Sequence, residues 1–441
     1  MQTYAMFLAS VVLVGTWLVI FPRGSRGRII WVGCGVVILL GIAWFMWQVS
    51  DPSEPFSDFN QAYYPAGHAI THDISKLYDR RVGCEETAVC GYVNIPLVAL
   101  TFAPLSMATL GRAQQLFALL SLFCVTSAVH WLVVLTAADA WKRWAIASLF
   151  VLNGPLFYSL REGNLTHVAL MLLVFALVCV ERRREVWAGA LVACVAIIKL
   201  PLGLLGVVFV LKRQWRIVLG MAMTLLAVIG MSLFWAGWES HVTWYNESIH
   251  PFVSKALAAF NVQSVDGFLL RLQNESRLYD WKPVEVDGSI RTVRAVIIGM
   301  MLLASGVILQ RHALEQSNDL LFLDLSIVLC LALIISPISW THYYVFLLIP
   351  FALYLGGRLP VSLGSAWAVS IMLCLVLVSP PVIFLDPASS LLGNSVGKLF
   401  LSHYFFGALW LWGTFCLARW RASKQRHSFI SAVIGPFRKA A

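Results

Sequence analysis

Charged residues are scarce in this sequence, and their scarcity excludes a soluble globular protein. Only 12% of the 441 residues are charged and 59% are hydrophobic, whereas about 25% of the residues in soluble domains are charged. Apolar runs recur from Tyr4 to the region of Leu417, which leaves no detachable soluble domain between them. Because so much apolar surface must face lipid, the composition predicts one all-α polytopic membrane body.

Three other signals are missing. No Lys or Arg precedes the first apolar run, 4–21, so the basic start of a cleaved signal peptide is absent and we expect this run to remain a helix. No Cys/His cluster has the spacing of a zinc site. No Asp-x-Asp motif is present, so we expect no metal and no other cofactor.

The net charge of +10 is spread over short basic clusters between apolar runs, which argues against nucleic acid as a partner. By the positive-inside rule these clusters lie in the cytoplasm. They comprise Arg23/Arg26/Arg28, Lys142/Arg143, Arg182/Arg183/Arg184, Lys212/Arg213/Arg216 and Arg419/Arg421/Lys424/Arg426. The pattern predicts a bacterial inner-membrane protein with its N-terminus outside.

The apolar runs predict about 11–13 spans. Eleven are continuous: 4–21, 29–49, 112–136, 144–160, 165–180, 217–236, 293–310, 319–336, 343–357, 361–384 and 400–418. The stretch 187–211 has basic clusters on both sides and Lys199-Leu200-Pro201 in its middle, so we expect two short helices that fold back at Lys199. The resulting parts are an extra N-terminal helix and basic loop (1–28), a transmembrane body (29–418) and a basic cytoplasmic tail (419–441).

Two long segments, 50–111 and 237–292, are expected to fold on the outer side. Residues 60–72 and 94–107 have the aromatic, Pro-punctuated character of interfacial helices, although ordinary ordered loops are equally compatible with it. Cys84 and Cys90 share the first outer segment, where an oxidising compartment permits a disulfide; two free thiols are the alternative. The other seven cysteines fall in spans and are expected to be buried apolar residues.

Ionisable residues at the outer ends of spans are the candidate chemistry, because charge in or beside a membrane is costly. They are Asp58, Arg161-Glu162-Gly163-Asn164, Lys199 and His342. A carboxylate, two cations and a histidine around one cavity can deprotonate a hydroxyl and neutralise a phosphate leaving group. These are the requirements of glycosyl transfer from a lipid phosphate.

Each residue also has a structural interpretation. Asp58 can be a helix cap, and Lys199 can snorkel or form a salt bridge with Glu162. His342 can bond a neighbouring carbonyl, and Arg161 can anchor a helix end at the headgroups.

The order of short motifs along the chain resembles glycosyltransferase family 87 of the GT-C superfamily, which includes polyprenol-phosphate-mannose-dependent mannosyltransferases. The resemblance spans about residues 50–360. The motifs are Asp58-Phe59, Tyr63-Tyr64-Pro65-Ala66, Leu77-Tyr78-Asp79, Tyr92-Val93-Asn94-Ile95-Pro96-Leu97, Ala103-Pro104-Leu105, Gly163-Asn164, Ile198-Lys199-Leu200-Pro201, Lys212-Arg213-Gln214-Trp215-Arg216, and Ser336-Pro337 with Trp340 and His342. Two of them depart from the family pattern, in which Gly-Gln and Tyr-Pro-Pro are usual where Gly163-Asn164 and Asn94-Ile95-Pro96 stand here.

The resemblance implies a GT-C helix bundle and an inverting transfer of a hexose, mannose in the family, from a polyprenyl phosphate at the outer face. Asp58 matches the catalytic base, and Lys199 and His342 match positions that contact the donor phosphate, with Arg161 as a third cation. We expect Asn60, Tyr63, Tyr64, Glu162, Asn164 and Trp340 to line the site or contact the acceptor. The implied partners are membrane lipids, the polyprenyl-phosphate sugar and a glycolipid or glycan acceptor.

Two other functions are compatible with parts of the pattern. A secondary transporter also places ionisable residues in spans, but it predicts internal repeats and charges near the midplane. In a non-catalytic lipid-binding protein, the polar motifs of the outer segments would have no catalytic role.

Overall fold

The computed structural model describes residues 56–78, 91–273, 278, 281–310, 317–361, 364–380 and 395–438. Helices dominate these residues, and the all-α prediction is confirmed. Two short strands not anticipated from the sequence, β1 (Lys255–Ala256) and β2 (Val284–Glu285), pair antiparallel. The spans predicted at 4–21 and 29–49, and the cysteines Cys84 and Cys90, lie outside the described residues.

The helices divide into short ones near Asp58 and longer apolar ones. In chain order they are η1 (Phe59–Tyr63), α3 (Tyr64–His72), η2 (Ile74–Lys76), α4 (Pro96–Leu100), α5 (Ala103–Ser106), α6 (Leu110–Leu135), α7 (Ala140–Val151), α8 (Gly154–Glu162), α9 (Thr166–Glu181), α10 (Glu185–Ile198), η3 (Leu200–Leu204), α11 (Leu205–Leu211), α12 (Trp215–Trp244), η4 (Tyr245–Ile249), α13 (Pro251–Ser254), α14 (Val265–Gln273), α15 (Gly288–Gln310), α16 (Asn318–Ile335), η5 (Thr341–Leu347), α17 (Leu348–Leu355), α18 (Ser365–Val378), α19 (Ser395–Leu401) and α20 (His403–Arg438).

Several helices have the length and composition of membrane spans. Within the described residues, α6, the stretch Trp215–Ser254 that begins with α12, α15 and α16 are each long and apolar enough to cross a bilayer. Large apolar side chains on α12 and α15 are exposed, and Phe234 is 91% exposed. Because water would not tolerate such surfaces, these helices face lipid and the chain is a membrane protein.

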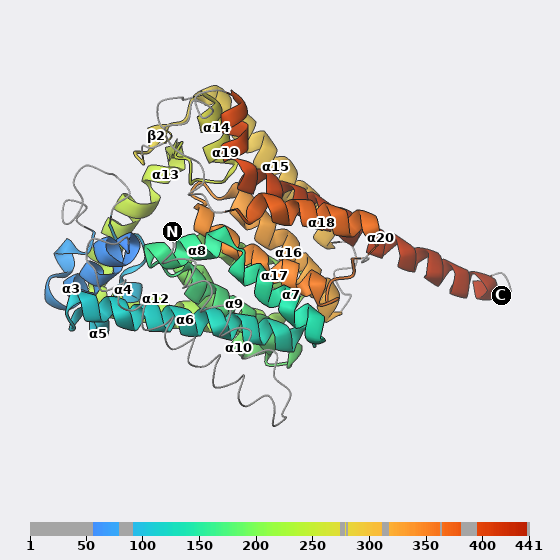
Figure 1. Ribbon diagram of the computed structural model, residues 1–441, viewed down its shortest axis with the longest axis horizontal. Helices are drawn as coiled ribbons and strands as arrows, with labels where there is room; N and C mark the ends of the chain where they lie inside the picture. Colours follow the sequence, from blue (N-terminus) through green and yellow to red (C-terminus); the bar gives the residue numbers. More distant parts are fainter. Residues whose placement is uncertain are drawn as a thin grey trace.

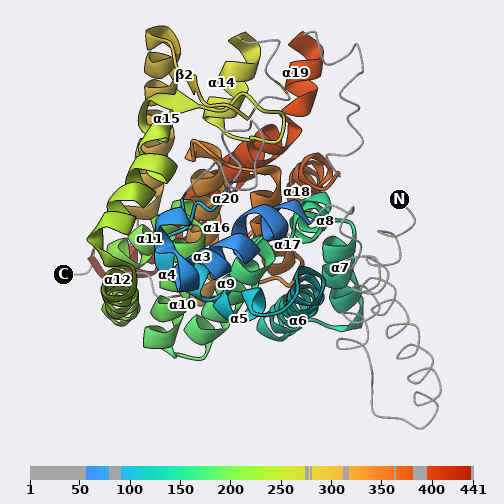
Figure 2. The same ribbon diagram turned by 90° about the vertical axis from the view of Figure 1, so that its left-hand side faces the viewer.

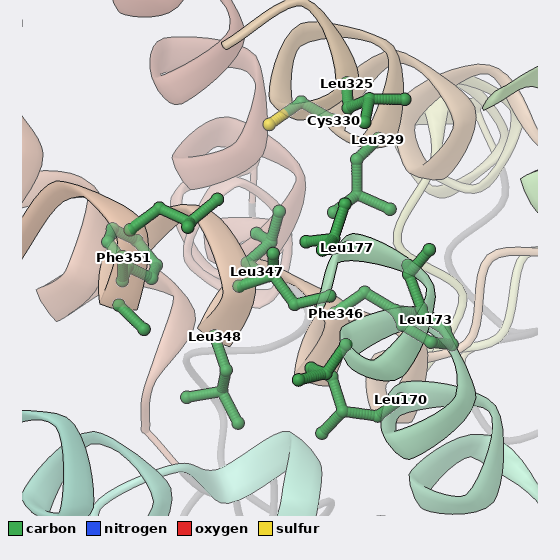
Figure 3. Packing of buried hydrophobic residues seen from close by; sticks show 14 of the residues in the cluster. Leu170, Leu173, Leu177, Leu325, Leu329, Cys330, Phe346, Leu347, Leu348 and Phe351 are labelled. Carbon is green, nitrogen blue, oxygen red and sulfur yellow. The ribbon is translucent and has the colours of Figure 1, made fainter. Parts of the chain in front are cut away.

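The packed core lies where α9, α16, η5 and α17 meet (Figure 3). Leu170, Leu173 and Leu177 of α9 recur at helical spacing, and Leu173 and Leu177 face Leu325 and Leu329 of α16. α9 also packs between α6 and α10, and α10 packs on α12. Figure 1 shows these helices as one layer, with α15, α18 and α20 on the other side of α16 and α17.

The break predicted at Lys199 is confirmed. α10 ends at Ile198, Pro201 follows in the 3₁₀ helix η3, and α11 resumes at Leu205. Proline lacks an N–H and cannot continue the regular helix, so the chain changes direction at Lys199.

The continuous span predicted at 144–160 is wrong. α7 ends at Val151 and α8 begins at Gly154, because the side chain of Asn153 caps the second helix by accepting from Leu156 N at 2.8 Å. Asn favours this capping position over the middle of a helix. The break therefore gives two short helices in place of one span, and α8 packs against η5 and α9 near Asp58.

The other boundaries shift without changing the pattern. α12 continues past the predicted end at 236, through a kink at Gly237 (φ 74°), to Trp244. The span predicted at 343–357 begins as η5, and α18 ends at Val378.

Short helices form a layer over one end of the bundle. Both predicted interfacial stretches are helical, with α3 in the first and α4 and α5 in the second. α4 packs on α12, and this layer (blue in Figure 2) faces the viewer in front of α9 and α10.

The second outer segment also folds, as predicted. Arg271 of α14 is fully buried and donates to the carbonyls of Ala259 (3.0 Å) and Val262 and to Ser402 Oγ. These bonds dock the segment against the beginning of α20.

Two predicted cytoplasmic loop cations are buried instead. Lys212 Nζ lies 2.7 Å from Asp324 Oδ2, and Arg419 Nε donates to Asp324 Oδ1 at 2.9 Å. A carboxylate inside α16 needs paired cations at that depth, so Lys212 and Arg419 belong to the bundle. The helix α20 continues through most of the predicted tail and extends beyond the bundle in Figure 1.

The cysteines in the described spans are free, and most are buried, as predicted.

Candidate active site

Asp58 stands at the start of the π-helix η1 and is partly buried. Its neighbours Phe56 and Phe59 are buried against Phe117 of α6, with the Phe59 and Phe117 rings stacked at 4.9 Å. The Asp58 side chain makes no capping bond. The aromatic packing therefore fixes the backbone while the carboxylate remains available for chemistry.

The turn between α8 and α9 lies against this segment. Gly163 adopts φ 67°, and a Cβ there would lie 2.9 Å from Phe59 Cβ and 3.0 Å from the Phe56 ring. Only glycine meets both the left-handed conformation and the close approach. The turn places Glu162 and Asn164 close enough to Asp58 to influence its carboxyl group.

Hydrogen bonds orient both of these side chains. Ser57 Oγ donates to Glu162 Oε2. Asn164 Oδ1 accepts from Thr166 N (2.7 Å) and from Ser159 Oγ (3.0 Å). The Asn164 amide nitrogen forms no hydrogen bond within the described residues, but the amide lies close enough to Asp58 to lower the pKa of its carboxyl group.

Lys199 reaches the same place from the break after α10. Asn94 Nδ2 donates to the carbonyl of Ile198 at 3.0 Å and holds the last turn of α10. The Lys199 side chain is only 7% exposed, and its Nζ lies 4.4 Å from the centre of the Tyr343 ring. No ion pair joins Lys199 to Glu162 in the described part of the chain, which argues against the purely structural salt bridge.

His342 lies in η5 and is 6% exposed. Thr341 donates from its backbone N (2.8 Å) and its Oγ1 (3.1 Å) to the carbonyl of Asn261, which fixes the start of η5. His342 Nδ1 finds no hydrogen-bond partner among the residues that the structure covers. Its ring lies 5.9 Å from that of Tyr158, whose hydroxyl accepts from Asn261 Nδ2 at 3.3 Å.

The environment raises the pKa of Asp58 to about 7. Burial is the largest cause, because it disfavours the charged form, and the negative charge of Glu162 adds to it. Lys199 and the Asn164 amide oppose the shift by stabilising the carboxylate. A carboxylate with a pKa near neutrality is suited to accept a proton during catalysis.

Most of the site residues selected from the sequence lie around Asp58. Electrostatic and hydrogen-bonding interactions connect Asp58, Tyr63, Arg161, Glu162, Asn164, Lys199 and His342. The others are engaged elsewhere: Tyr64 Oη donates to Ala108 O (2.8 Å), Asn60 Oδ1 accepts from Gln114 (2.7 Å), and Trp340 pairs with Val262 in a β-bridge.

Sequence reasoning missed three residues of this cluster. His167 at the start of α9 is fully buried, and Tyr158 and Tyr343 both interact with the charge of Asp58. His167 could have been selected from the sequence, because an ionisable residue at the beginning of a predicted span is costly unless it has a functional or structural partner. The two tyrosines carry no such signal.

Within the described residues, no three His, Cys, Asp or Glu side chains are grouped so that they could hold a metal ion. The cluster therefore offers a carboxylate beside a lysine and neutral hydrogen-bonding groups. It has the composition of a site that moves a proton and binds an anion.

An apolar helix bundle with a buried acid–base cluster at one end defines a membrane-embedded enzyme. The family model for glycosyltransferase family 87 matches residues 92–337, more than half of the sequence. The chain belongs to this family and is a glycosyltransferase. The match contains Lys199, Glu162 and Asn164, whereas Asp58 and His342 lie outside it.

Two curated relatives are similar over much of the chain. Both are described as polyprenol-phosphate-mannose-dependent alpha-(1-2)-phosphatidylinositol mannoside mannosyltransferases. The protein from Mycolicibacterium smegmatis is 24% identical over 353 residues, which cover 74% of this chain and 76% of that protein. The protein from Mycobacterium tuberculosis is 26% identical over 282 residues, 59% of this chain and 61% of that protein. Family membership favours an enzyme over a transporter or a non-catalytic lipid-binding protein.

Proposed function

We propose that this enzyme transfers mannose from a polyprenyl phosphate to a hydroxyl of a lipid- or glycan-linked acceptor, with inversion at the anomeric carbon. The donor class is that of the relatives' printed names. The single observation that carries the mechanism is the juxtaposition of Asp58, with its pKa near 7, and the cation Lys199.

The mechanism uses Asp58 as general base. The carboxylate takes the proton of the acceptor hydroxyl while that oxygen attacks the anomeric carbon. The bond between this carbon and the phosphate oxygen breaks, and the phosphate leaves with the electron pair. A single displacement of this kind inverts the configuration, and it needs one base on the attacking side.

Lys199 and His342, with Arg161, are assigned to the departing phosphate. Charge grows on the phosphate as the bond breaks, and fixed cations and donors in a water-poor site stabilise that charge strongly. Lys199 is held beside Tyr343 without a competing carboxylate bond in the described chain. It can therefore neutralise the phosphate where a divalent metal does so in other transferases.

We place the site at the outer face of a bacterial inner membrane. In support, the Asp58 cluster lies at the Thr166 end of α9, whereas the basic residues 182–184 follow its other end at Glu181. Basic loops remain on the cytoplasmic side. A polyprenyl donor then reaches the site laterally from the lipid.

Substitution of Asp58 by Asn tests the proposal, because it keeps the size of the side chain but removes the base. We expect transfer of radiolabelled mannose from polyprenyl-phosphate mannose to fall by roughly 10²–10⁴-fold. Substitution of the half-exposed Asp73, whose side chain bonds only Ser75 and Lys76 in the described structure, is the matched control and should leave transfer unchanged. Full transfer by the folded D58N protein would remove Asp58 from the mechanism.

A further inference from the structure

His167 is a buried histidine to which the mechanism above gives no task. It is the second residue of α9 and has no exposed surface. Its Nε2 lacks a hydrogen-bond partner anywhere in the described chain. An unsatisfied buried nitrogen is costly, so its retention calls for a ligand that completes it.

The hydrogen bonds of the neighbouring groups fix the tautomer of this imidazole. Ser159 Oγ has one hydrogen and donates it to Asn164 Oδ1. The oxygen must therefore accept from His167 Nδ1, which lies 3.0 Å away and carries the proton. In the neutral ring, Nε2 then carries no proton and presents only its lone pair.

The surroundings of His167 favour an anion beside Nε2 when that nitrogen is protonated. Lys199 and His342 are the titratable groups that act on it, and the Phe117 ring of α6 lies 6.1 Å away. The acids of α16 do not reach it: Asp319 and Asp324 lie near the opposite end of the bundle, bound to Arg358, Lys212 and Arg419. A second cation beside Lys199 is unfavourable in the empty site, so the imidazole is neutral there.

We propose that His167 is a further binding residue for the lipid phosphate, and that its Nε2 takes up one proton when a second negative charge develops on that phosphate. The inference rests on the proposed function, because it assumes a lipid phosphate beside Lys199. It adds a residue and a proton to that site.

The proton and charge balance follows from the transfer. The donor is a phosphodiester with one negative charge, and cleavage leaves a phosphomonoester with two. The acceptor proton goes to Asp58, and a proton from water reaches Nε2, so that His167⁺ and Lys199⁺ together match the dianion. A charge-assisted hydrogen bond then replaces the bare lone pair.

Calorimetry on the full chain in lipid nanodiscs tests the inference without sugar or acceptor. A short-chain polyprenyl monophosphate and its methyl diester are titrated at pH 7.5, where the monoester is a dianion because its second pKa is about 6. Repeating each titration in two buffers of different ionisation enthalpy gives the protons taken up. We expect about one proton for the monoester and none for the diester.

The variant His167→Gln retains a hydrogen-bonding side chain of similar size but cannot be protonated. It should lose the proton uptake. Its preference in affinity for the monoester over the diester should fall by roughly tenfold. His130→Gln, at the other end of α6 beside Trp131, is the matched control and should keep both. If the Gln variant does not fold, Ser159→Ala is used: without that acceptor the Nε2–H tautomer can form, and uptake should fall well below one proton.

The outcomes separate the two proposals. Monoester binding by the parent protein without proton uptake, or full uptake by the folded H167Q protein, overturns the inference and leaves the donor class intact. Failure of the parent protein to bind either lipid phosphate overturns the donor class itself. Inorganic phosphate that competes as well as the lipid would assign the proton to a free-phosphate site and would also overturn the inference.

Discussion

The chemistry of a single carboxyl group is central to this enzyme at the residue scale. A free aspartate has an ordinary pKa of 3.8, and burial together with the charge of Glu162 raises that of Asp58 to about 7. Below that pH the folded protein holds a protonated Asp58 that cannot act as a base. The raised pKa therefore limits activity on the acid side.

We predict that kcat/KM for mannosyl transfer rises with pH up to about 7 and falls again at alkaline pH, once Lys199 loses the positive charge that the departing phosphate requires. Glu162→Gln removes a neighbouring negative charge, so the Asp58 carboxylate forms more easily and the acid limb should move to lower pH. A pH profile of the parent and E162Q proteins measures both effects.

Ser57→Ala is the matched control for this prediction, because it removes the donor to Glu162 and leaves both carboxylates in place. Its acid limb should stay close to that of the parent protein, or move slightly to lower pH, because loss of the Ser57 bond raises the pKa of Glu162 and reduces its negative charge. An E162Q limb displaced to higher pH would contradict the assigned electrostatics.

Residue identities in this cluster were predictable to different degrees. Asp58, Lys199 and His342 stood out because charge at the end of an apolar run has a cost. The bonds of Asn164, by contrast, depend on the left-handed turn at Gly163 and on Ser159 in another helix. Spacing along the chain contains no information on such contacts.

At the scale of elements, the break between α10 and α11 is the feature that brings a lysine to the site. Pro201 explains why the helix ends, and the sequence was sufficient to predict it. The sequence was not sufficient to show which residue holds the last turn of α10 in place. Asn94, from the layer of short helices, bonds the Ile198 carbonyl and thereby positions Lys199.

We predict that Asn94→Ala raises KM for the donor and lowers kcat/KM by roughly tenfold, because a buried carbonyl loses its donor and Lys199 loses its support. Steady-state kinetics with varied polyprenyl-phosphate mannose measure the effect.

Thr126→Ala is the control for Asn94→Ala, since it also removes a buried hydrogen bond, within α6 to Leu122. It should lower thermal stability without changing KM. Equal losses of stability with equal KM in both variants would show that Asn94 is structural only.

Helix boundaries show where sequence patterns fail. The run 144–160 is apolar apart from a few polar residues, but Asn153 caps a new helix and Pro155 stands in its first turn, which divides the run into α7 and α8. In lipid an asparagine inside an apolar run can be a cap, a buried polar residue or part of a site, and hydropathy does not distinguish these. α9 and α16 were predicted well because nothing interrupts their cores.

At the scale of the whole molecule, orientation relative to the membrane decides which substrates can reach the site. We predict that a cysteine introduced at the exposed His68, beside the Asp58 layer, reacts with a membrane-impermeant maleimide in intact spheroplasts. A cysteine at the exposed Arg183 should react only after permeabilisation. The reverse pattern would place the site in the cytoplasm.

The bundle end opposite the site is stabilised by buried charge, and here sequence reasoning did not predict the ion pairs. Lys212 and Arg419 were read as loop residues because basic clusters usually are. Their partner Asp324 is 0% exposed in the middle of an apolar helix, and that carboxylate was the available signal. A charge inside a span predicts partners of opposite sign nearby.

We predict that Asp324→Ala destabilises the protein by about 3–5 kcal/mol, because it leaves two buried cations without a counter-ion. The triple variant K212M/D324L/R419M replaces all three charges by apolar side chains and should recover most of that loss. Lys142→Met, which breaks the half-exposed pair with Asp139 at 3.5 Å and leaves the Asp139 cap of α7 in place, should cost less than about 1 kcal/mol. Thermal unfolding in one detergent ranks the variants, and a D324A protein as stable as the parent would show that the buried charges are not coupled.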